Sequence, residues 1–165
     1  MGTVADRPRT QPQIPLRSDK QARLRIAYVC LGNSCRSQMA EAWTRHLSGG
    51  RVEAVSAGVE PLGFVALETI QVMEEKQISL AGQRSKGLHA IDWKLVNVLV
   101  NMSHRPTAAL VPEFEGRRLE WDVPDPYGDD LATYRQVRDL LEEQVKKLIA
   151  DLKGAPDGPA APPVA

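Results

Sequence analysis

The chain of 165 residues lacks several features that mark common protein classes. Its two cysteines are too few for a disulfide-rich scaffold or a set of zinc fingers. Its 21 basic and 21 acidic side chains cancel, so it lacks the positive field of a non-specific nucleic-acid binder. It has no apolar run near the ~18 residues of a membrane span, and no apolar segment behind its basic N-terminus that would form a secretory signal. We therefore expect a protein of a reducing, cytoplasmic compartment, with no nucleic-acid or membrane partner.

Proline is concentrated at the two ends of the chain. Seven of the 12 prolines lie within residues 1–23 and 154–165. The first segment is basic, poor in apolar residues and without periodicity, and the second reads GAPDGPAAPPVA. Neither composition supports a packed core. We expect two disordered tails around one folded domain of residues 24–153, which we expect to be a monomer.

Strand patterns and helix patterns alternate between these tails. The run 25–30 is short and apolar and stops at a Gly/Asn/Ser loop, as a buried strand does. The last helix is the clearest, because the apolar residues of 131–152 recur on one face. In chain order we expect strands at 25–30, 52–57, 96–102 and 118–123, and helices at 39–47, 67–73, after Pro106 and at 131–152. This alternation predicts a flavodoxin-like α/β three-layer sandwich, with a four-stranded parallel sheet and helices on both faces.

The sequence CLGNSCR, from Cys30 to Arg36, joins the first expected strand to the first expected helix. A Gly-containing loop at a helix N-terminus offers backbone N–H groups and positive potential to an anion. Arginine can bind two oxygens of that anion at once, and the same field favours a nucleophilic thiolate at Cys30. The loop lacks the Gly-Lys-Ser/Thr ending of a Walker loop. The cysteines and histidines lack metal-ligand spacing, so we expect neither a metal nor an organic cofactor.

The residues inside this loop are expected to form the anion site. Asn33 suits a left-handed backbone turn, and Gly32 removes a Cβ atom that would crowd the anion. Cys35 is close enough in sequence to reach Cys30 and capture it after oxidation, which makes it a candidate redox partner. The substrate-binding residues expected in and directly after the loop are Leu31, Gly32, Asn33, Ser34, Cys35 and Ser37.

A second segment, WDVPDPY, follows the last expected strand and carries candidate acids. Loops that follow parallel strands gather at one edge of the sheet, so this segment can meet the Cys30 loop. A phosphate-ester leaving group needs a proton, which a positioned carboxylic acid supplies. Asp125 is the expected general acid, because the proline after it stiffens its loop, and Asp122 is the rival. Tyr127 is a candidate wall for the substrate, and Phe64 is a weaker candidate for the opposite wall.

The loop Cys30–Ser37 and the triplet Asp125–Tyr127 together resemble the low-molecular-weight protein tyrosine phosphatases and the related thioredoxin-coupled arsenate reductases. The likeness covers about residues 26–152. It implies the shared fold of that family, with Cys30 as nucleophile, Arg36 as phosphate clamp and Asp125 as general acid. It also implies that Asn33 holds the loop and that Ser37 hydrogen-bonds the Cys30 thiolate. The implied ligands are a phosphotyrosine protein or small aryl phosphate, with phosphate and arsenate as competing oxyanions.

The sequence departs from both branches of this family. Gln38 resembles the reductases, where phosphatases usually have proline, and Gln83 replaces the histidine of a Gly-His-Arg-Ser turn. The reductases use further cysteines downstream, and none follows Cys35. We expect a protein tyrosine phosphatase that forms a cysteinyl-phosphate. The alternatives are an arsenate reductase that uses a small thiol with glutaredoxin-like help, and a phosphate-binding module without turnover.

Overall fold

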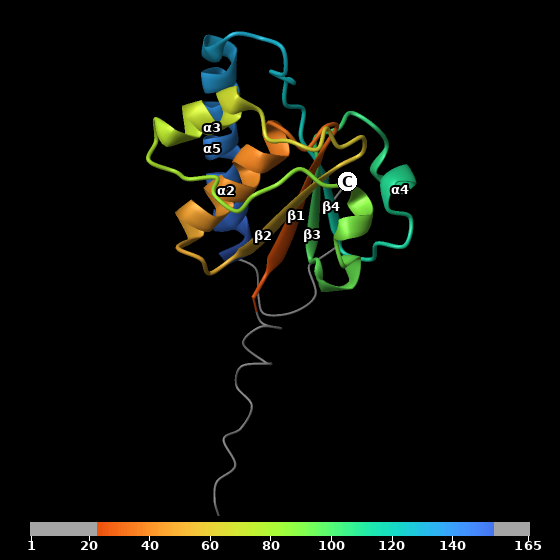
Figure 1. Cartoon of the computed structure of the whole chain (residues 1–165). Helices are drawn as coiled ribbons and strands as arrows, with labels where there is room; N and C mark the ends of the chain where they lie inside the picture. The colour runs from red at the N-terminus through yellow and green to blue at the C-terminus, as the bar shows by residue number, and fades with distance from the viewer. Residues whose placement is uncertain (1–22, 154–165) are drawn as a thin grey trace, which may run out of the picture.

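A computed structural model describes residues 23–153. The two expected tails lie outside these residues, apart from position 23. The described chain forms one sheet of four parallel strands in the order β2-β1-β3-β4. The strands are β1 (Arg25–Cys30), β2 (Glu53–Gly58), β3 (Val98–Asn101) and β4 (Arg117–Glu120). Helices cover both faces of the sheet, so the expected α/β three-layer architecture is confirmed (Figure 1).

The central strand β1 contributes to a core on each side of the sheet because successive side chains point to opposite faces. Ile26 and Tyr28 pack toward α2 (Arg36–Ser48), α3 (Leu67–Glu74) and α5 (Leu131–Lys153). Ala27 and Val29 pack into the second core. That core lies beside α4 (Thr107–Leu110) and the 3₁₀ helices η1 (Leu88–Ala90) and η2 (Trp93–Leu95). A strand covered on both faces explains why the sequence of β1 is almost entirely apolar.

Two helix ends, the end of α2 and the start of α5, follow ordinary capping chemistry. Gly49 ends α2 with φ of 62°, a left-handed conformation that glycine adopts without strain. Asp130 precedes α5, and its carboxylate accepts hydrogen bonds from Thr133 N at 3.0 Å and Thr133 Oγ1 at 2.8 Å. These bonds satisfy an N–H group that the first turn of a helix leaves free.

Three expectations about the elements need correction. β3 spans four residues rather than the expected seven, and η1 and η2 were not expected. β4 ends at Glu120 rather than at Val123. The chain leaves the sheet there because the carbonyl of Val123 turns to Arg36, and Pro124 and Pro126 have no N–H group to offer a neighbouring strand.

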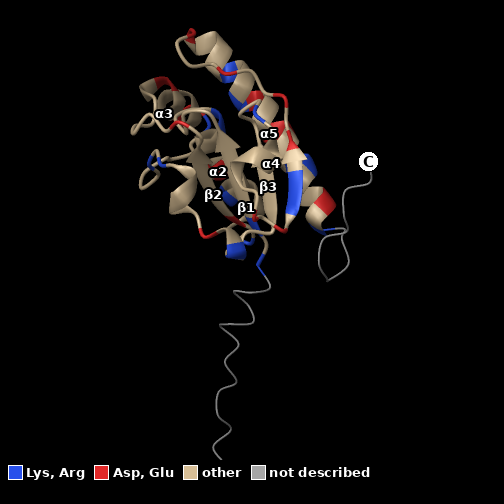
Figure 2. Cartoon of the chain, turned by 90° about the vertical axis from the view of Figure 1, so that its right-hand side faces the viewer, with Lys and Arg blue, Asp and Glu red and all other residues tan. Residues whose placement is uncertain are grey.

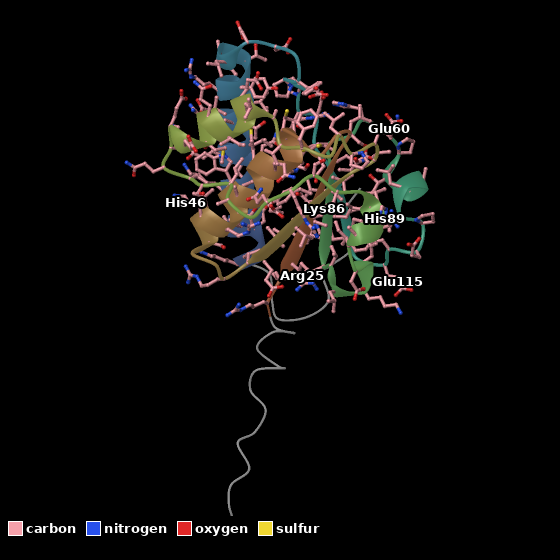
Figure 3. The ribbon with its side chains drawn as sticks, viewed as in Figure 1. Arg25, His46, Glu60, Lys86, His89 and Glu115 are labelled. Carbon is pink, nitrogen blue, oxygen red and sulfur yellow. The ribbon has the colours of Figure 1, made fainter. Side chains whose placement is uncertain are left out.

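The carboxyl ends of all four strands meet at one edge of the sheet. In Figure 3, Glu60, which follows β2, lies at this edge, while Arg25 lies at the opposite end of β1. Figure 2 shows Lys and Arg interspersed with Asp and Glu on the side that it presents. Among residues 23–153, no helix is both long and apolar enough to cross a membrane. The loops that follow the four strands lie at the carboxyl edge of the sheet, where open α/β folds bind their ligands.

Candidate active site

The loop between β1 and α2 turns its carbonyl groups away from its centre. The carbonyls of residues 31, 32 and 34 accept hydrogen bonds of 2.8 to 3.2 Å from backbone N–H groups within 60–66. Asn33 adds a fourth outward carbonyl, which accepts from Gln38 Nε2 at 3.1 Å. In a trans peptide the N–H group points opposite to the carbonyl, so the N–H groups of this loop face inward. Such a concave row of N–H groups at the start of a helix binds anions.

Asn33 maintains the bend of this loop. Its φ of 48° is the left-handed conformation expected from the sequence. Its side-chain Nδ2 donates to Ser37 Oγ at 2.7 Å and to Ser56 Oγ at 3.0 Å. Asn33 and Ser37 are both fully buried. Neither lines the pocket, although both were expected to contact the substrate.

The Cys30 sulfur lies at the carboxyl end of β1 with two hydrogen-bond partners. Ser37 Oγ is 2.9 Å from Cys30 Sγ, and Asn33 N donates to the same sulfur at 3.2 Å. The residue is only 2 % exposed, and it lines the pocket. The backbone N–H group of Asn33 and the hydroxyl of Ser37 therefore both face this sulfur. This arrangement suits a nucleophile.

Arg36 is held with part of its guanidinium free for a ligand. Its Nη1 donates to the carbonyl oxygens of Met102 at 2.6 Å and Val123 at 3.1 Å, which are on the loops after β3 and β4. Its Nη2 lies 3.4 Å from Asp125 Oδ2. Its Nε is buried and has no hydrogen-bond partner among the described residues. An oxyanion in the pocket would accept a hydrogen bond from Nε, because Arg36 lines that pocket.

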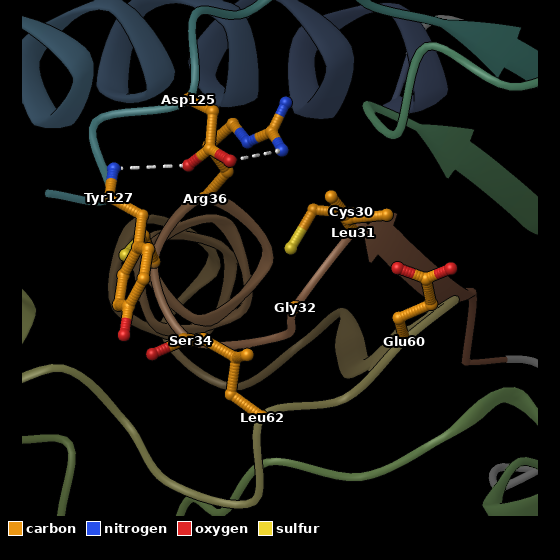
Figure 4. Close-up of a pocket in the computed structure, with 10 residues that line it drawn as sticks. Cys30, Leu31, Gly32, Ser34, Arg36, Glu60, Leu62, Asp125 and Tyr127 are labelled. Atoms are coloured by element: carbon orange, nitrogen blue, oxygen red, sulfur yellow. Dashed lines mark hydrogen bonds and ion pairs between the residues drawn. The ribbon is translucent and has the colours of Figure 1, made fainter.

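Asp125 rather than Asp122 belongs to the pocket. Asp125 lines it, and its Oδ1 accepts a hydrogen bond from Tyr127 N at 3.1 Å (Figure 4). The side chain of Asp122 is 97 % exposed and pairs with His104 Nε2 at 3.0 Å instead. Asp125, the expected general acid, therefore lines the same pocket as Cys30, and Asp122 does not.

The pocket has a volume of about 170 Å³, and two apolar side chains form walls of it. Tyr127 was expected there, and Leu62 was not. Phe64 was the expected second wall, but it is half-exposed and does not line the pocket. A Cβ atom on Gly32 would lie 3.0 Å from Leu62 Cγ, so this glycine makes room for Leu62. Glu60 also lines the pocket, and it was not expected from the sequence.

Residues of the loop, the expected phosphate clamp and the expected acid all line this one pocket. Eight of the expected site residues do so: Cys30, Leu31, Gly32, Ser34, Cys35, Arg36, Asp125 and Tyr127. Glu60 and Leu62 carry no motif. Their position directly after β2 was the available signal, because that loop also ends at the carboxyl edge of the sheet.

The second cysteine differs from the first in its surroundings. Burial raises the pKa of the Cys35 thiol, and hydrogen bonds with Thr69 and Tyr134 oppose this in part. Its Sγ lies 3.5 Å from Tyr134 Oη. Cys35 therefore stays a thiol at neutral pH, which suits a reserve group better than a nucleophile.

Proteins similar in sequence to this chain include arsenate reductases. A glutaredoxin arsenate reductase from Synechocystis is 34 % identical over 78 % of this chain and 98 % of its own. An arsenate reductase from Bacillus cereus strain Q1 is 33 % identical over 74 % of this chain and 91 % of its own. Both comparisons span nearly the whole of the relatives.

Solved structures point to phosphatases as well. The YwlE arginine phosphatase from Geobacillus stearothermophilus superposes with a TM-score of 0.71 at 30 % identity, over 79 % of this chain and 93 % of its own. The tyrosine phosphatase Wzb from Escherichia coli K30, in complex with sulphate, gives a TM-score of 0.69 at 26 % identity, over 78 % and 97 %. A family model described as low molecular weight phosphotyrosine protein phosphatase matches residues 25–156. The chain belongs to this family, whose members include phosphatases and arsenate reductases.

Proposed function

We propose that the protein hydrolyses phosphate monoesters and that its substrate is a protein tyrosine phosphate. The observation that supports this proposal is the meeting of Cys30, Arg36 and Asp125 around one pocket that also has an aromatic wall. Tyr127 and Leu62 can contact the two faces of a phenyl ring, while the inward N–H groups of the loop bind the phosphate.

The reaction runs in two steps. The Cys30 thiolate attacks phosphorus in line, and the phosphorus–oxygen bond to the leaving group breaks. Asp125 gives its proton to the leaving oxygen. Arg36 and the loop N–H groups hold the equatorial oxygens, where the charge of the transition state lies. In the second step Asp125 takes a proton from water, whose oxygen displaces the Cys30 sulfur and releases phosphate.

An arsenate reductase that uses a small thiol with glutaredoxin-type help is the second candidate. The curated relatives named above favour it, since both are described as arsenate reductases. Arsenate has the shape and charge of phosphate and fits the same cradle. The chain has Cys30 and Cys35 alone, and both line the pocket. A relay of disulfides from the pocket to thioredoxin needs further thiols, so an external thiol would have to complete the cycle.

A parallel assay separates the two candidates. The purified protein is given phosphotyrosine, phosphoserine and phosphoarginine peptides and a small aryl phosphate, and separately arsenate with thioredoxin or with glutathione and glutaredoxin. We expect turnover of the tyrosine phosphate and of the aryl phosphate, competitive inhibition by arsenate, and no multiple turnover with thioredoxin. Steady arsenite production with glutathione and glutaredoxin, faster than hydrolysis of any phosphate, would select the reductase. A preference for phosphoserine would keep the hydrolysis of phosphate monoesters and reject the tyrosine substrate. A preference for phosphoarginine, whose phosphate is bound to nitrogen, would keep the hydrolase and reject the ester substrate.

A further inference from the structure

Two glutamines contact each other behind the loop, at the positions where the sequence departs from the pattern of phosphatases. Gln38 is on α2 and is fully buried, and Gln83 lies on the segment between α3 and η1. Gln83 Nε2 donates to Gln38 Oε1 at 2.7 Å and to the Gln38 carbonyl at 3.1 Å. Two departures that are 45 residues apart in sequence therefore form one hydrogen-bonded pair.

The surroundings of Gln38 leave its amide one favourable orientation. Its Nε2 faces three oxygen atoms: Asn33 Oδ1 at 3.0 Å, the Asn33 carbonyl at 3.1 Å and the Arg84 carbonyl at 3.0 Å. Its Oε1 faces the Nε2 donor of Gln83. Turning the amide by 180° would set one oxygen against three others and set two amide nitrogens against each other. Gln83 thus acts together with the backbone carbonyls of Asn33 and Arg84 to fix which end of Gln38 faces the loop.

The orientation of the Gln38 amide determines which atom of the Asn33 side chain can face it. Asn33 Oδ1 accepts from Gln38 Nε2 and from Lys86 N at 2.9 Å, so the oxygen of this amide faces away from the sulfur. Its Nδ2 is left to donate to the hydroxyl of Ser37 at 2.7 Å and to that of Ser56 at 3.0 Å. The donors that face Asn33 Oδ1 therefore leave Asn33 Nδ2 to face the two serine hydroxyls.

The chain of hydrogen bonds ends on the nucleophile. Ser37 Oγ accepts from Asn33 Nδ2, and its single hydrogen is then free for Cys30 Sγ, 2.9 Å away. A hydroxyl that donates to sulfur stabilises the thiolate, whereas one that accepts from sulfur stabilises the thiol. The direction of every bond from Gln83 to Cys30 agrees with the thiolate form.

We propose that Gln38 and Gln83 are positioning residues that hold this hydrogen-bond chain in the direction that favours the Cys30 thiolate. The proposal deepens the proposed function and rests on it in one respect, that Cys30 is the nucleophile. Its prediction about the reactivity of Cys30 does not depend on which substrate the protein uses. Gln83 acts only through Gln38, so the two residues are expected to be coupled.

The test measures how fast iodoacetamide alkylates Cys30 as a function of pH, with the modified residue located by fragment mass spectrometry. We expect Gln83→Leu to raise the pH of half-maximal reactivity by about one unit and to lower kcat/KM for an aryl phosphate at pH 6 about tenfold. The inhibition constant of inorganic phosphate should change less than twofold, because the N–H cradle and Arg36 remain. Gln83→His, which can again donate to Gln38 Oε1, should restore both values.

The control and the double variant separate positioning from packing. Gln136→Leu changes an exposed glutamine on α5 and should leave the pH profile unchanged. Gln38→Leu should raise the midpoint at least as much as Gln83→Leu, and the double variant should add nothing further to Gln38→Leu. Arg36, Asp125 and Glu60, the charged side chains that line the pocket with Cys30, are the same in every variant.

An unchanged midpoint in folded Gln83→Leu, or additive shifts in the double variant, would overturn the proposal. If Gln83→Leu does not fold, Gln83→Met replaces it, because it keeps the length of the side chain and removes its donor, and the same outcomes decide. If the midpoint shifts in a protein that hydrolyses no phosphate ester, the result supports the positioning role of the two glutamines and contradicts the proposed function. If the protein hydrolyses phosphate esters and the midpoint does not shift, the result supports the proposed function and contradicts the positioning role.

Discussion

At the scale of single residues, one of the two candidate acids lines the pocket. Asp125 faces the pocket with Arg36 Nη2 3.4 Å from its Oδ2, while Asp122 points to solvent. A general acid contributes about 10²–10⁴-fold to a rate, and most to leaving groups that are poor without a proton. The role of Asp125 can therefore be tested by substituting it and measuring how the fall in rate depends on the leaving group.

We predict that Asp125→Asn lowers kcat about 100-fold or more for phenyl phosphate and much less for p-nitrophenyl phosphate. The reason is that nitrophenolate leaves without a proton and phenolate does not. Steady-state kinetics over a series of aryl phosphates measures the effect, with Asp122→Asn as the matched control that should retain activity. An equal loss across the series, or a larger loss in the Asp122 variant, would assign the acid elsewhere.

The second cysteine carries a prediction about oxidation. Mild peroxide is expected to convert the Cys30 thiolate to a sulfenic acid, and the Cys35 thiol then displaces water to form a disulfide. Dithiothreitol should restore activity in the wild type. Cys35→Ser should start with comparable activity and lose it irreversibly, because the sulfenic acid oxidises further. Equal recovery of the two proteins would show that Cys35 plays no part in protection.

Residues that follow one another in a motif were predictable, and residues brought in by packing were not. Cys30, Arg36 and Asp125 carry their chemistry in the sequence, because they lie in two short segments at the ends of expected strands. Leu62 was missed because its place depends on how the segment 60–66 hydrogen-bonds to the loop, and no residue type records that.

At the scale of elements, α3 and α5 are joined at the end of α3 by an ionic cluster. Glu75 accepts hydrogen bonds from Arg135 and from Arg138, whose side chain is buried. The hydrogen bond from Arg135 is the main cause that lowers the pKa of Glu75 to about 2, and Arg138 adds to it. A carboxyl whose pKa is lower in the folded state stabilises the fold above its unfolded pKa.

We therefore predict that Glu75→Gln lowers the melting temperature at pH 7 and that the difference from the wild type shrinks between about pH 4.5 and pH 2. In that range the wild type loses the stabilisation that the variant never had. Calorimetry across pH measures it, with the exposed Glu143→Gln as a control. A difference that stays constant down to pH 2 would show that Glu75 stabilises the fold through packing and not through charge.

The predictability of the elements followed their periodicity. β1 and α5 have clear patterns. Both ends of β1 and the start of α5 were located where the structure has them, and the end of α5 was located to within one residue. η1 and η2 were missed because a single 3₁₀ turn is too short to show a period. The early end of β4 was missed because it is set by the contact between Val123 and Arg36, which lie 87 residues apart.

At the scale of the whole molecule, exposed apolar side chains line the pocket and continue along the chain from it. Of the six exposed large apolar residues within residues 23–153, Leu62 and Tyr127 line the pocket, and Phe64 and Leu67 follow Leu62 in sequence. If the substrate is a phosphoprotein, as proposed above, the residues on either side of the phosphorylated one would contact these segments.

We predict that Phe64→Ser with Leu67→Ser lowers kcat/KM about fivefold for a phosphotyrosine peptide with apolar neighbours. The same double variant should leave hydrolysis of p-nitrophenyl phosphate unchanged, because that substrate does not extend past the pocket. Leu95→Ser, which removes an exposed leucine of η2, is the control. Equal effects on the peptide and on p-nitrophenyl phosphate would rule out a docking role for these residues.

The central claim is that the protein transfers phosphate through Cys30, and rapid-quench trapping tests it most directly. The wild type is mixed with excess aryl phosphate, quenched in acid within milliseconds and digested, and the site of phosphate attachment is located by mass spectrometry. We predict a phosphate on Cys30 that forms with the burst of released phenol, accumulates further in Asp125→Asn with an activated substrate, and is absent from Cys30→Ser at the same times. Multiple turnovers without phosphate on Cys30, or turnover retained in Cys30→Ser, would contradict the account.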